Sequence, residues 1–529
     1  MLLPLFNIPF RKSFSLQLAS IGLRLFSVAA LMGSLTGCGH LGNWVHNGFK
    51  VGPDYSKPAV SVADDWIEFN NPKVISDSYG VENQAWWGVF QDEQINQLVD
   101  ETYEQNLTLR AASMRILEAE AERAIAVGLM FPQFQEGFGE YSRVQISRNE
   151  TLNVGFPFRN FSNWNTGFRA AWELDVWGRY RRAIEAADSQ VDATVENYDD
   201  ILTSLLAETA ATYVEIRGFQ ERIVYAEANI KTQEKNLQLA EIRFDAKDVS
   251  KLDVTEARSS LELTRSLVPT FESGLRQANN RLCILLGLPT RDLIPQLGDE
   301  SIPSTPSDVV VGIPADLIRR RPDLRRAERE VAAQSALIGI AVSDLFPAFT
   351  INGSINWSAA DFSDIFRSSS NGGLIGPSFN WNLLNYGRLV NKVRVQDARF
   401  QQLAIDYQQQ VLKANGEVED AIIFFLKSQE AVASLQASVD ATAESVRLAS
   451  IQYREGAITF DRVNNMQRDL TQVQDQLAVA ETNVALSLIQ TYRALGGGWQ
   501  IRLGASPDVS IPAPAEPPAE PIPPAPDPV

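Results

Sequence analysis

A tandem duplication is the feature that most constrains what this chain can fold into. The segment Trp172–Arg179 recurs as Trp381–Arg388, 209 residues later (381 minus 172). Upstream, Phe131-Pro132 recurs as Phe346-Pro347 at a spacing of 215 (346 minus 131). Repeats of this kind are structural units that bury their apolar faces against each other. Each half is therefore expected to form the same series of elements, with a small change of length inside the series.

Long helices are indicated by apolar residues that recur every seven positions. They are Ile216, Ile223, Ile230, Leu237 and Phe244 in the first half and Phe425, Val432, Val439, Val446 and Tyr453 in the second. This spacing is typical of coiled coils. The first such helix, from about Arg182 to Phe244, would be about 90 Å long. Alternating spacings of three and four over 254–282 and 463–484 predict a continuous antiparallel partner helix in each half.

Four segments alternate apolar and polar residues as strands do. They are 349–357 and 375–383 in the second half, 164–174 in the first half, and less regularly 134–142. The same alternation fits two amphipathic hairpins on a soluble core. It also fits strands with one face toward lipid and one toward water, as in a membrane barrel. Because four strands are too few to close a barrel, several protomers would have to share one.

The N-terminus favours the membrane interpretation. Arg11 and Lys12 precede an apolar stretch that ends in Leu35-Thr36-Gly37-Cys38, which resembles a bacterial lipobox. Cys38 would then be the first mature residue and carry a covalent lipid, and Gly39 after it favours transfer to the outer membrane. The alternative is a hydrophobic leader that happens to contain a cysteine. No later run of about 18 apolar residues follows, so no spanning helix is expected.

Composition argues against an enzyme, a metal site or a nucleic-acid partner. The chain has only two histidines and two cysteines, and its net charge is −18. Nucleophile–base sets and metal ligands are therefore scarce, and the basic face that nucleic acids require is missing. No Gly-rich phosphate loop is present. No cofactor is expected apart from the lipid on Cys38, and energy for any transport has to come from a partner.

Two further motifs resemble those of a known family. Val51–Tyr55 (VGPDY) follows the lipid site, and Gly312–Glu328 (GIPADLIRRRPDLRRAE) lies between the repeats. Together with the repeats they resemble the outer-membrane factors of efflux pumps, the TolC and NodT group, and especially its lipoprotein branch. The arginines of the second motif are expected to surround a helix start at Pro322 and Asp323 rather than to bind substrate.

The resemblance implies a fold and a function. The expected fold is mainly helical with a transmembrane β part: a homotrimer shares a twelve-stranded β-barrel, and long coiled-coil hairpins form an α-barrel across the periplasm. The expected function is the passive exit duct of a tripartite efflux system, with a periplasmic adaptor and an inner-membrane transporter of the RND type as partners. A type I secretion duct and a lipid-anchored coiled-coil envelope scaffold are the alternatives. The transported substrate is left open.

In this family the tips of the long hairpins close the tube. The residues expected at this periplasmic gate are Asp248, Ser250, Asp253, Glu256, Arg454, Glu455, Gly456, Thr459, Asp461, Arg462 and Asn465. We hypothesise that Asp461, Arg462 and Asp253 form the network that closes it. Some family members carry carboxylates where Arg462 and Asn465 stand here, so the gate chemistry differs. The alternative is that these are solvated turn residues.

The sequence also predicts five segments along the chain. They are a lipoprotein signal peptide at 1–37, a lipid-anchored extension at 38–91, a first structural repeat at 92–297, a second repeat at 298–504 and a disordered tail at 505–529. The tail assignment follows from its proline, alanine and acidic composition.

Overall fold

The computed structural model describes residues 44–75, 81–147 and 160–504. The predicted leader, the lipid site at Cys38 and the predicted tail lie outside these ranges. Within them, no helix combines the length and the apolar character needed to cross a membrane.

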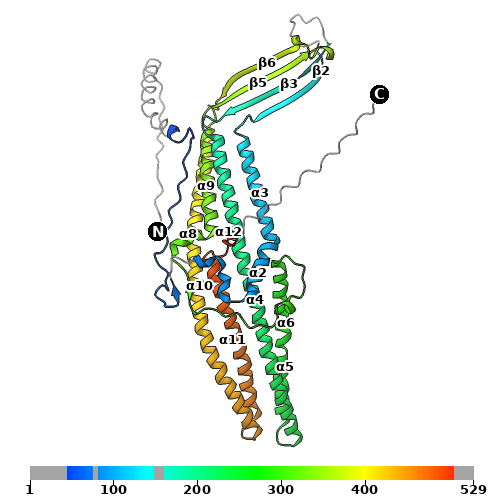
Figure 1. Cartoon of the computed structure of the whole chain (residues 1–529), viewed down its shortest axis with the longest axis vertical. Helices are drawn as coiled ribbons and strands as arrows, with labels where there is room; N and C mark the ends of the chain where they lie inside the picture. Colours follow the sequence, from blue (N-terminus) through cyan, green and yellow to red (C-terminus); the bar gives the residue numbers. More distant parts are fainter. Residues whose placement is uncertain (1–43, 76–80, 148–159, 505–529) are drawn as a thin grey trace, which may run out of the picture. The chain divides into compact units, whose positions relative to one another are not determined.

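Helices and strands follow one another in the order that the duplication predicts (Figure 1). The elements of the first half are β1 Val74–Ile75, η1 Val81–Phe90, α2 Glu93–Gln105, α3 Leu107–Gly128, β2 Phe134–Gln145, β3 Asn160–Leu174, α4 Arg179–Asp245, α5 Lys251–Arg265, α6 Leu267–Leu285 and α7 Ile294–Leu297. Those of the second half are β4 Val309–Val310, η2 Pro314–Asp316, α8 Leu317–Arg320, α9 Pro322–Ser343, β5 Ala348–Ala359, η3 Phe362–Asp364, η4 Ser368–Ser370, β6 Asn371–Asn380, α10 Arg388–Arg454, α11 Phe460–Ala494 and α12 Ile501–Gly504.

The chain divides into two compact units, and both draw on both repeats. The first contains the sheet and the helix ends next to it. The second contains most of the helical residues and the largest apolar cluster, which includes Trp86, Tyr213, Leu282 and Phe425. This division neither supports nor opposes the predicted repeat boundaries, which stay a prediction.

The sheet of the first unit has four antiparallel strands in the order β2-β3-β5-β6. Its two central strands come from different repeats, and Trp164 of β3 lies opposite Ala359 of β5. Phe168, Ile355 and Ile375 lie on one face, as the predicted alternation requires, because their registers connect them across three neighbouring strands. Among the described residues, β2 and β6 each have one edge that pairs with no other strand.

The structure confirms the duplication in detail. α4 and α10 have 67 residues each and are 209 positions apart, which makes each about 100 Å long. α3 and α9 have 22 residues each and are 215 apart. β5 begins 214 residues after β2 (348 minus 134), so the second repeat is one residue shorter than the first between the helix and the strand. The spacing then falls from 214 to 209, so the second repeat is five residues shorter between the two strands of the hairpin.

Two predictions about element ends were wrong. The partner helix of the first repeat is not continuous, because α5 ends at Arg265 and α6 begins at Leu267. Pro269 has no N–H to donate to the carbonyl of Arg265, which explains the break. In the second repeat Ala478 occupies the position of Pro269, and α11 is continuous. The last strand, expected at 375–383, ends at Asn380, which lies opposite Ala348, the first residue of β5.

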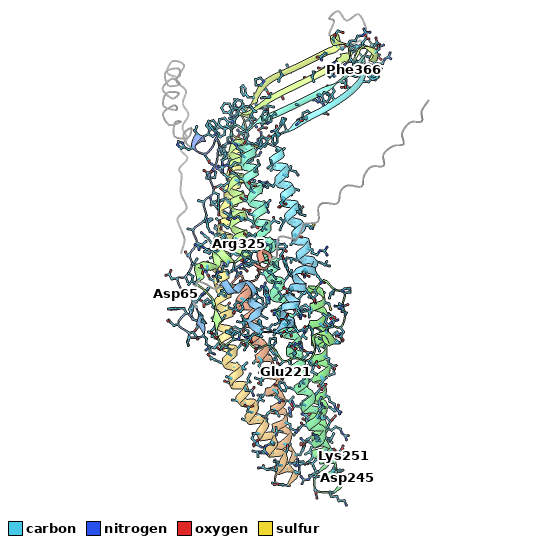
Figure 2. All side chains as sticks on the ribbon, in the orientation of Figure 1. Asp65, Glu221, Asp245, Lys251, Arg325 and Phe366 are labelled. Atoms are coloured by element: carbon cyan, nitrogen blue, oxygen red, sulfur yellow. The ribbon has the colours of Figure 1, made fainter. Side chains whose placement is uncertain are left out.

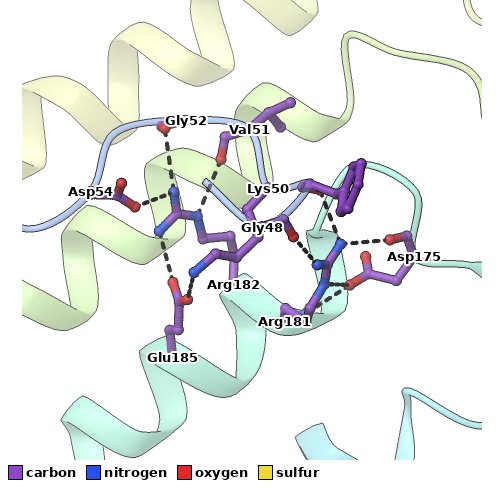
Figure 3. Close-up of polar contacts among 10 residues, drawn as sticks. Gly48, Lys50, Val51, Gly52, Asp54, Asp175, Arg181, Arg182 and Glu185 are labelled. Atoms are coloured by element: carbon purple, nitrogen blue, oxygen red, sulfur yellow. Dashed lines mark hydrogen bonds and ion pairs between the residues drawn. The ribbon is translucent and has the colours of Figure 1, made fainter. Parts of the chain in front are cut away.

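The segment that contains the VGPDY motif is bound to the start of α4 (Figure 3). The Arg182 guanidinium donates to the carbonyl oxygens of Val51 and Gly52 and pairs with Asp54 at 2.9 Å. The Arg182 side chain is only 3% exposed, and its bonds to these acceptors are charge-assisted. Gly52 has φ +85°, and a Cβ there would lie 2.4 Å from the Cα of Gly339. The motif is therefore a docking segment that requires glycine at this position.

The arginine-rich motif has the structural role expected of it. α9 begins at Pro322, and Arg321 forms a bidentate pair with Asp323 and donates to the carbonyl of Ala494 at 3.0 Å. Arg325 pairs with Glu196 at 2.5 Å and lies 4.2 Å from the ring centroid of Trp499. These contacts join the start of α9 to α4 and α11 inside the second unit and leave Arg321 and Arg325 engaged.

The break at Pro269 leads to a paired prediction. Replacing Ala478 with proline should destabilise the protein by about 3 kcal/mol, because Ala478 is fully buried in an unbroken helix. The replacement Pro269→Ala should instead protect the amides around Ser266 from hydrogen exchange. Hydrogen–deuterium exchange and thermal unfolding of both variants measure this. Equal losses in the two variants would contradict the assignment of the break to Pro269.

Candidate functional site at the hairpin tips

The first tip connects α4 to α5 through residues 246–250. Lys247 adopts φ +66°, and its N–H donates to the carbonyl of Phe244 at 2.9 Å. Ser250 caps α5: its hydroxyl accepts from the N–H of Leu252 and donates to Asp253 at 2.8 Å. The Asp253 carboxylate also lies in the first turn of α5, where the helix dipole favours a negative charge. Asp245 and Lys251 mark the two sides of this tip in Figure 2.

The second tip connects α10 to α11 in the same way. Gly456 has φ +76° and occupies the position equivalent to Lys247 (456 minus 209). Glycine takes this conformation without the strain that a lysine incurs. Thr459 has the extended backbone of an N-cap but its side chain makes no capping bond. Asp461 follows in the first turn of α11 and accepts from the Asn465 amide at 3.1 Å.

A small apolar cluster fastens the two tips to each other within the second unit. Its buried members are Ala240 of α4, Ala257 of α5, Ala449 and Tyr453 of α10, and Phe460 and Val463 of α11. The rings of Tyr453 and Phe460 meet edge to face with centroids 5.4 Å apart. Arg243 of α4 donates to the Tyr453 carbonyl, and its guanidinium lies 4.8 Å from the Tyr453 ring centroid. One cation thus joins the two hairpins.

Three carboxylates, two on the first hairpin and one on the second, oppose this contact between the hairpins. Burial and the nearby charges of Asp461 and Asp253 raise the pKa of Glu256 above its ordinary value. Burial and the charge of Asp253 likewise raise the pKa of the Tyr453 hydroxyl. The structure therefore brings together three of the residues that the sequence placed at the gate. The carboxylates of Asp253 and Glu256 on α5 and of Asp461 on α11 repel one another.

The charged residues that were also predicted at the gate lie on the surface of the tips. Asp248, Arg454, Glu455 and Arg462 are exposed, and the structure records no ion pair for any of them within the described part of the chain. The predicted network of Asp461, Arg462 and Asp253 was expected to join separate protomers. It therefore stays a prediction. Within one protomer, two of its carboxylates, Asp253 and Asp461, both lie near Glu256.

Sequence reasoning missed the polar groups that are buried behind the tips. Gln233 of α4 is 3% exposed, and both polar atoms of its amide have no hydrogen-bond partner among the described residues. Asn464 and Gln467 of α11 are buried with one unpaired atom each. Heptad analysis placed Val463 and Met466 on the seam, whereas Asn464 and Gln467 are also inside. An unpaired buried amide costs about 1–3 kcal/mol, so this packing is not optimised for stability.

Taken together, a duplicated sheet with one apolar face and two coiled-coil hairpins that meet at their tips define a class of protein. It is the protomer of an envelope channel, and the assignment of the hairpin tips as its gate stays a prediction.

Comparison with known proteins identifies the family. The family model described as outer membrane efflux protein matches residues 98–288 and 313–497. Nodulation protein T of Rhizobium leguminosarum bv. viciae is 29% identical over 463 residues, which cover 86% of this chain and 92% of that protein. The cation efflux system protein CusC of Escherichia coli K12 is 27% identical over 456 residues, covering 85% and 96%.

Solved structures agree with this identification. The outer-membrane channel OprN is 31% identical, with a TM-score of 0.80 over 85% of this chain and 99% of that chain. A structure of CusC is 25% identical, with a TM-score of 0.72 over 85% and 100%. The chain belongs to the outer membrane efflux protein family. It is an efflux channel of the outer membrane and not an enzyme.

The repulsion at the tips predicts a pH dependence. A carboxyl group whose pKa is raised in the folded state binds a proton more readily when folded, so stability rises as pH falls through that raised pKa. The variant Glu256→Gln should therefore raise the midpoint of thermal unfolding at pH 7 and weaken its increase on acidification. Glu455→Gln, at an exposed tip carboxylate, is the control. Identical pH profiles for wild type and Glu256→Gln would contradict the predicted repulsion.

Proposed function

We propose that three copies of this chain close their sheets into one ring of twelve strands and act as the passive exit duct of a tripartite efflux system. The observation that carries this proposal is an amphipathic sheet of four strands with an unpaired edge on each side. Open edges are not tolerated in lipid, and small closed sheets need about eight strands. The long hairpins would continue the ring as a helical duct.

The partners that we propose are a periplasmic adaptor and an inner-membrane transporter of the RND type. The chain's relatives include CusC, named a cation efflux system protein, and TtgC of Pseudomonas putida, named a probable efflux pump outer membrane protein. Other relatives are a nodulation protein and a pyoverdine export protein. Because these names span different cargoes, we place the choice of substrate in the pump.

We further propose that Cys38 carries the lipid that anchors the chain to the outer membrane. A relative in Salmonella typhimurium, SilC, is named a probable outer membrane lipoprotein and is 24% identical over 479 residues. The docked segment supports the anchor mechanically, because Arg181 binds the carbonyl of Gly48 and Arg182 binds those of Val51 and Gly52. The ten Cα–Cα steps from Cys38 to Gly48 span at most about 35 Å, which confines the lipid to one place on the duct.

The gate that we propose is the ring of hairpin tips. In three copies the carboxylates Asp253, Glu256 and Asp461 would form a negative ring at the narrow end of the duct. Rings of carboxylates favour cations and disfavour anions. The exposed Arg462 is free to pair with this ring across the boundary between copies, which is the closing network that the sequence suggested.

Conductance of the purified, acylated protein in a planar bilayer tests the proposed function, with the oligomeric state measured in the same detergent. A trimer with small, cation-selective steps is expected for a mostly closed duct. A monomer without conductance would contradict the proposal and favour the envelope scaffold. Cys38→Ser should lose the lipid and retain the conductance of reconstituted trimers.

Charge reversal tests the gate directly. In Arg462→Glu the closing pairs would be replaced by repulsion, so the single-channel conductance of the resting duct should rise. Arg454→Glu reverses the other exposed arginine of the same tip and should have little effect, because it lies outside the network. Unchanged conductance in Arg462→Glu would show that the assignment of this residue is wrong.

A further inference from the structure

Contacts inside one repeat predict contacts inside the other. The Trp172 indole donates to the carbonyl of Met130 at 3.1 Å, and the equivalent Trp381 donates to that of Leu345 at 3.1 Å. In the first hairpin Phe134 lies opposite Ala171. Shifting these two positions by 214 and 209 gives Ala348 and Asn380, which are opposite each other in the second hairpin. The same spacings therefore relate the strand pairing of the first hairpin to that of the second, as well as their sequences.

Two contacts from the first repeat to the second, in the sheet and at its base, have no counterpart among the described residues of the chain. β3 pairs with β5, whereas the equivalent strands, β6 and β2, are the two outer strands of the sheet. At the base of the sheet the Trp177 indole stacks on Phe346 with centroids 4.6 Å apart and donates to the Pro347 carbonyl at 2.8 Å. The equivalent Tyr386 and Phe131 are 92% and 64% exposed.

A pair of glycines shows the same asymmetry. Gly167 of β3 lies opposite Asn356, and a Cβ on it would come within 2.2 Å of the Ile355 carbonyl oxygen. Close approach of β5 thus explains this glycine. Its equivalent Gly376 of β6 has no atom within 4 Å of such a Cβ. Glycine inside a strand costs about 0.5–1 kcal/mol, and the described residues of one chain supply no neighbour that would explain Gly376.

We propose that this neighbour is β2 of a second copy, in the register transferred from the β3–β5 pair. Gly376 then lies opposite Ser142 of the next copy and Leu374 opposite Val144, while Tyr386 stacks on Phe131. This proposal rests on the proposed threefold assembly and specifies which residues meet in it.

The register also keeps the two faces of the sheet continuous. β3 places Trp164 opposite Tyr141 of β2, so Tyr141 belongs to the face that carries Phe168, Ile355 and Ile375. The proposed register puts Pro377 opposite Tyr141 of the next copy, on that same face. A slip of one residue would bring the Glu140 side of β2 onto the apolar face.

Cysteine cross-linking tests the register. Cys283, a buried free thiol, is first replaced by serine, and the acylated Cys38 is retained. The pair Leu374→Cys with Val144→Cys should then form a disulfide between copies and close a covalent trimer. The pair Leu374→Cys with Ser142→Cys, shifted by two residues, should give less covalent trimer by on the order of tenfold, because the Cα atoms are too far apart. Asn165→Cys with Ser358→Cys is the equivalent pair within one chain and should cross-link without a change in size.

Glycine variants test the close approach. Gly376→Ala should retain the helix content of the protomer and lose the trimer, since its methyl group meets the backbone of the next copy. The matched control is Gly372→Ala, whose equivalent in β3 is Asn163, a residue with a side chain. Gly167→Ala should damage the sheet of the protomer itself.

The outcomes separate this inference from the function on which it rests. If the wild type is a trimer but only the shifted pair cross-links, or Gly376→Ala and Gly372→Ala trimerise equally well, the proposed register is overturned and the duct is unaffected. If the wild type does not trimerise, both the register and the proposed function fail.

Discussion

The whole structure depends on the hydrogen-bonding groups at the edges of its sheet. A lipid environment offers no partner for backbone N–H and C=O groups, so each strand edge has to be paired by another strand. This chain supplies four strands and leaves the outer edges of β2 and β6 open. Duplication offers a solution with little new sequence, because the contact that joins the two repeats inside one chain can also join one chain to the next.

Elements with a strong local signal could be predicted from the sequence. The heptads of Ile216 to Phe244 lie within α4, and the spacing of 209 between the repeats predicted α10, its equivalent in the second repeat. The break before Leu267 was visible as Pro269, but the surrounding apolar spacing outweighed it in the prediction. The early end of β6 depends on where β5 begins, which is a property of the partner strand and not of the residues after Asn380.

At the tips the sequence placed the right segments but not their contacts. Asp253 is close to Glu256 because both lie one turn apart in α5, whereas Asp461 comes close to Glu256 only because one hairpin packs on the other. The bond from Arg243 to the Tyr453 carbonyl has no sequence signal, because a carbonyl acceptor is available at every residue. Periodicity identifies which face of a helix is buried, whereas it does not specify which helix covers that face.

The contact between the two hairpin tips is a balance between opposing interactions. The apolar cluster of Tyr453 and Phe460 and the Arg243 bond hold the hairpins together, while the carboxylates and the unpaired amides of Gln233 and Gln467 make that packing costly. A contact of this kind can be separated by a partner that offers a modest binding free energy. The core around Trp86 and Tyr213 buries far more apolar residues than the cluster at the tips, so the hairpins can separate at the tips while the rest of the protomer stays folded.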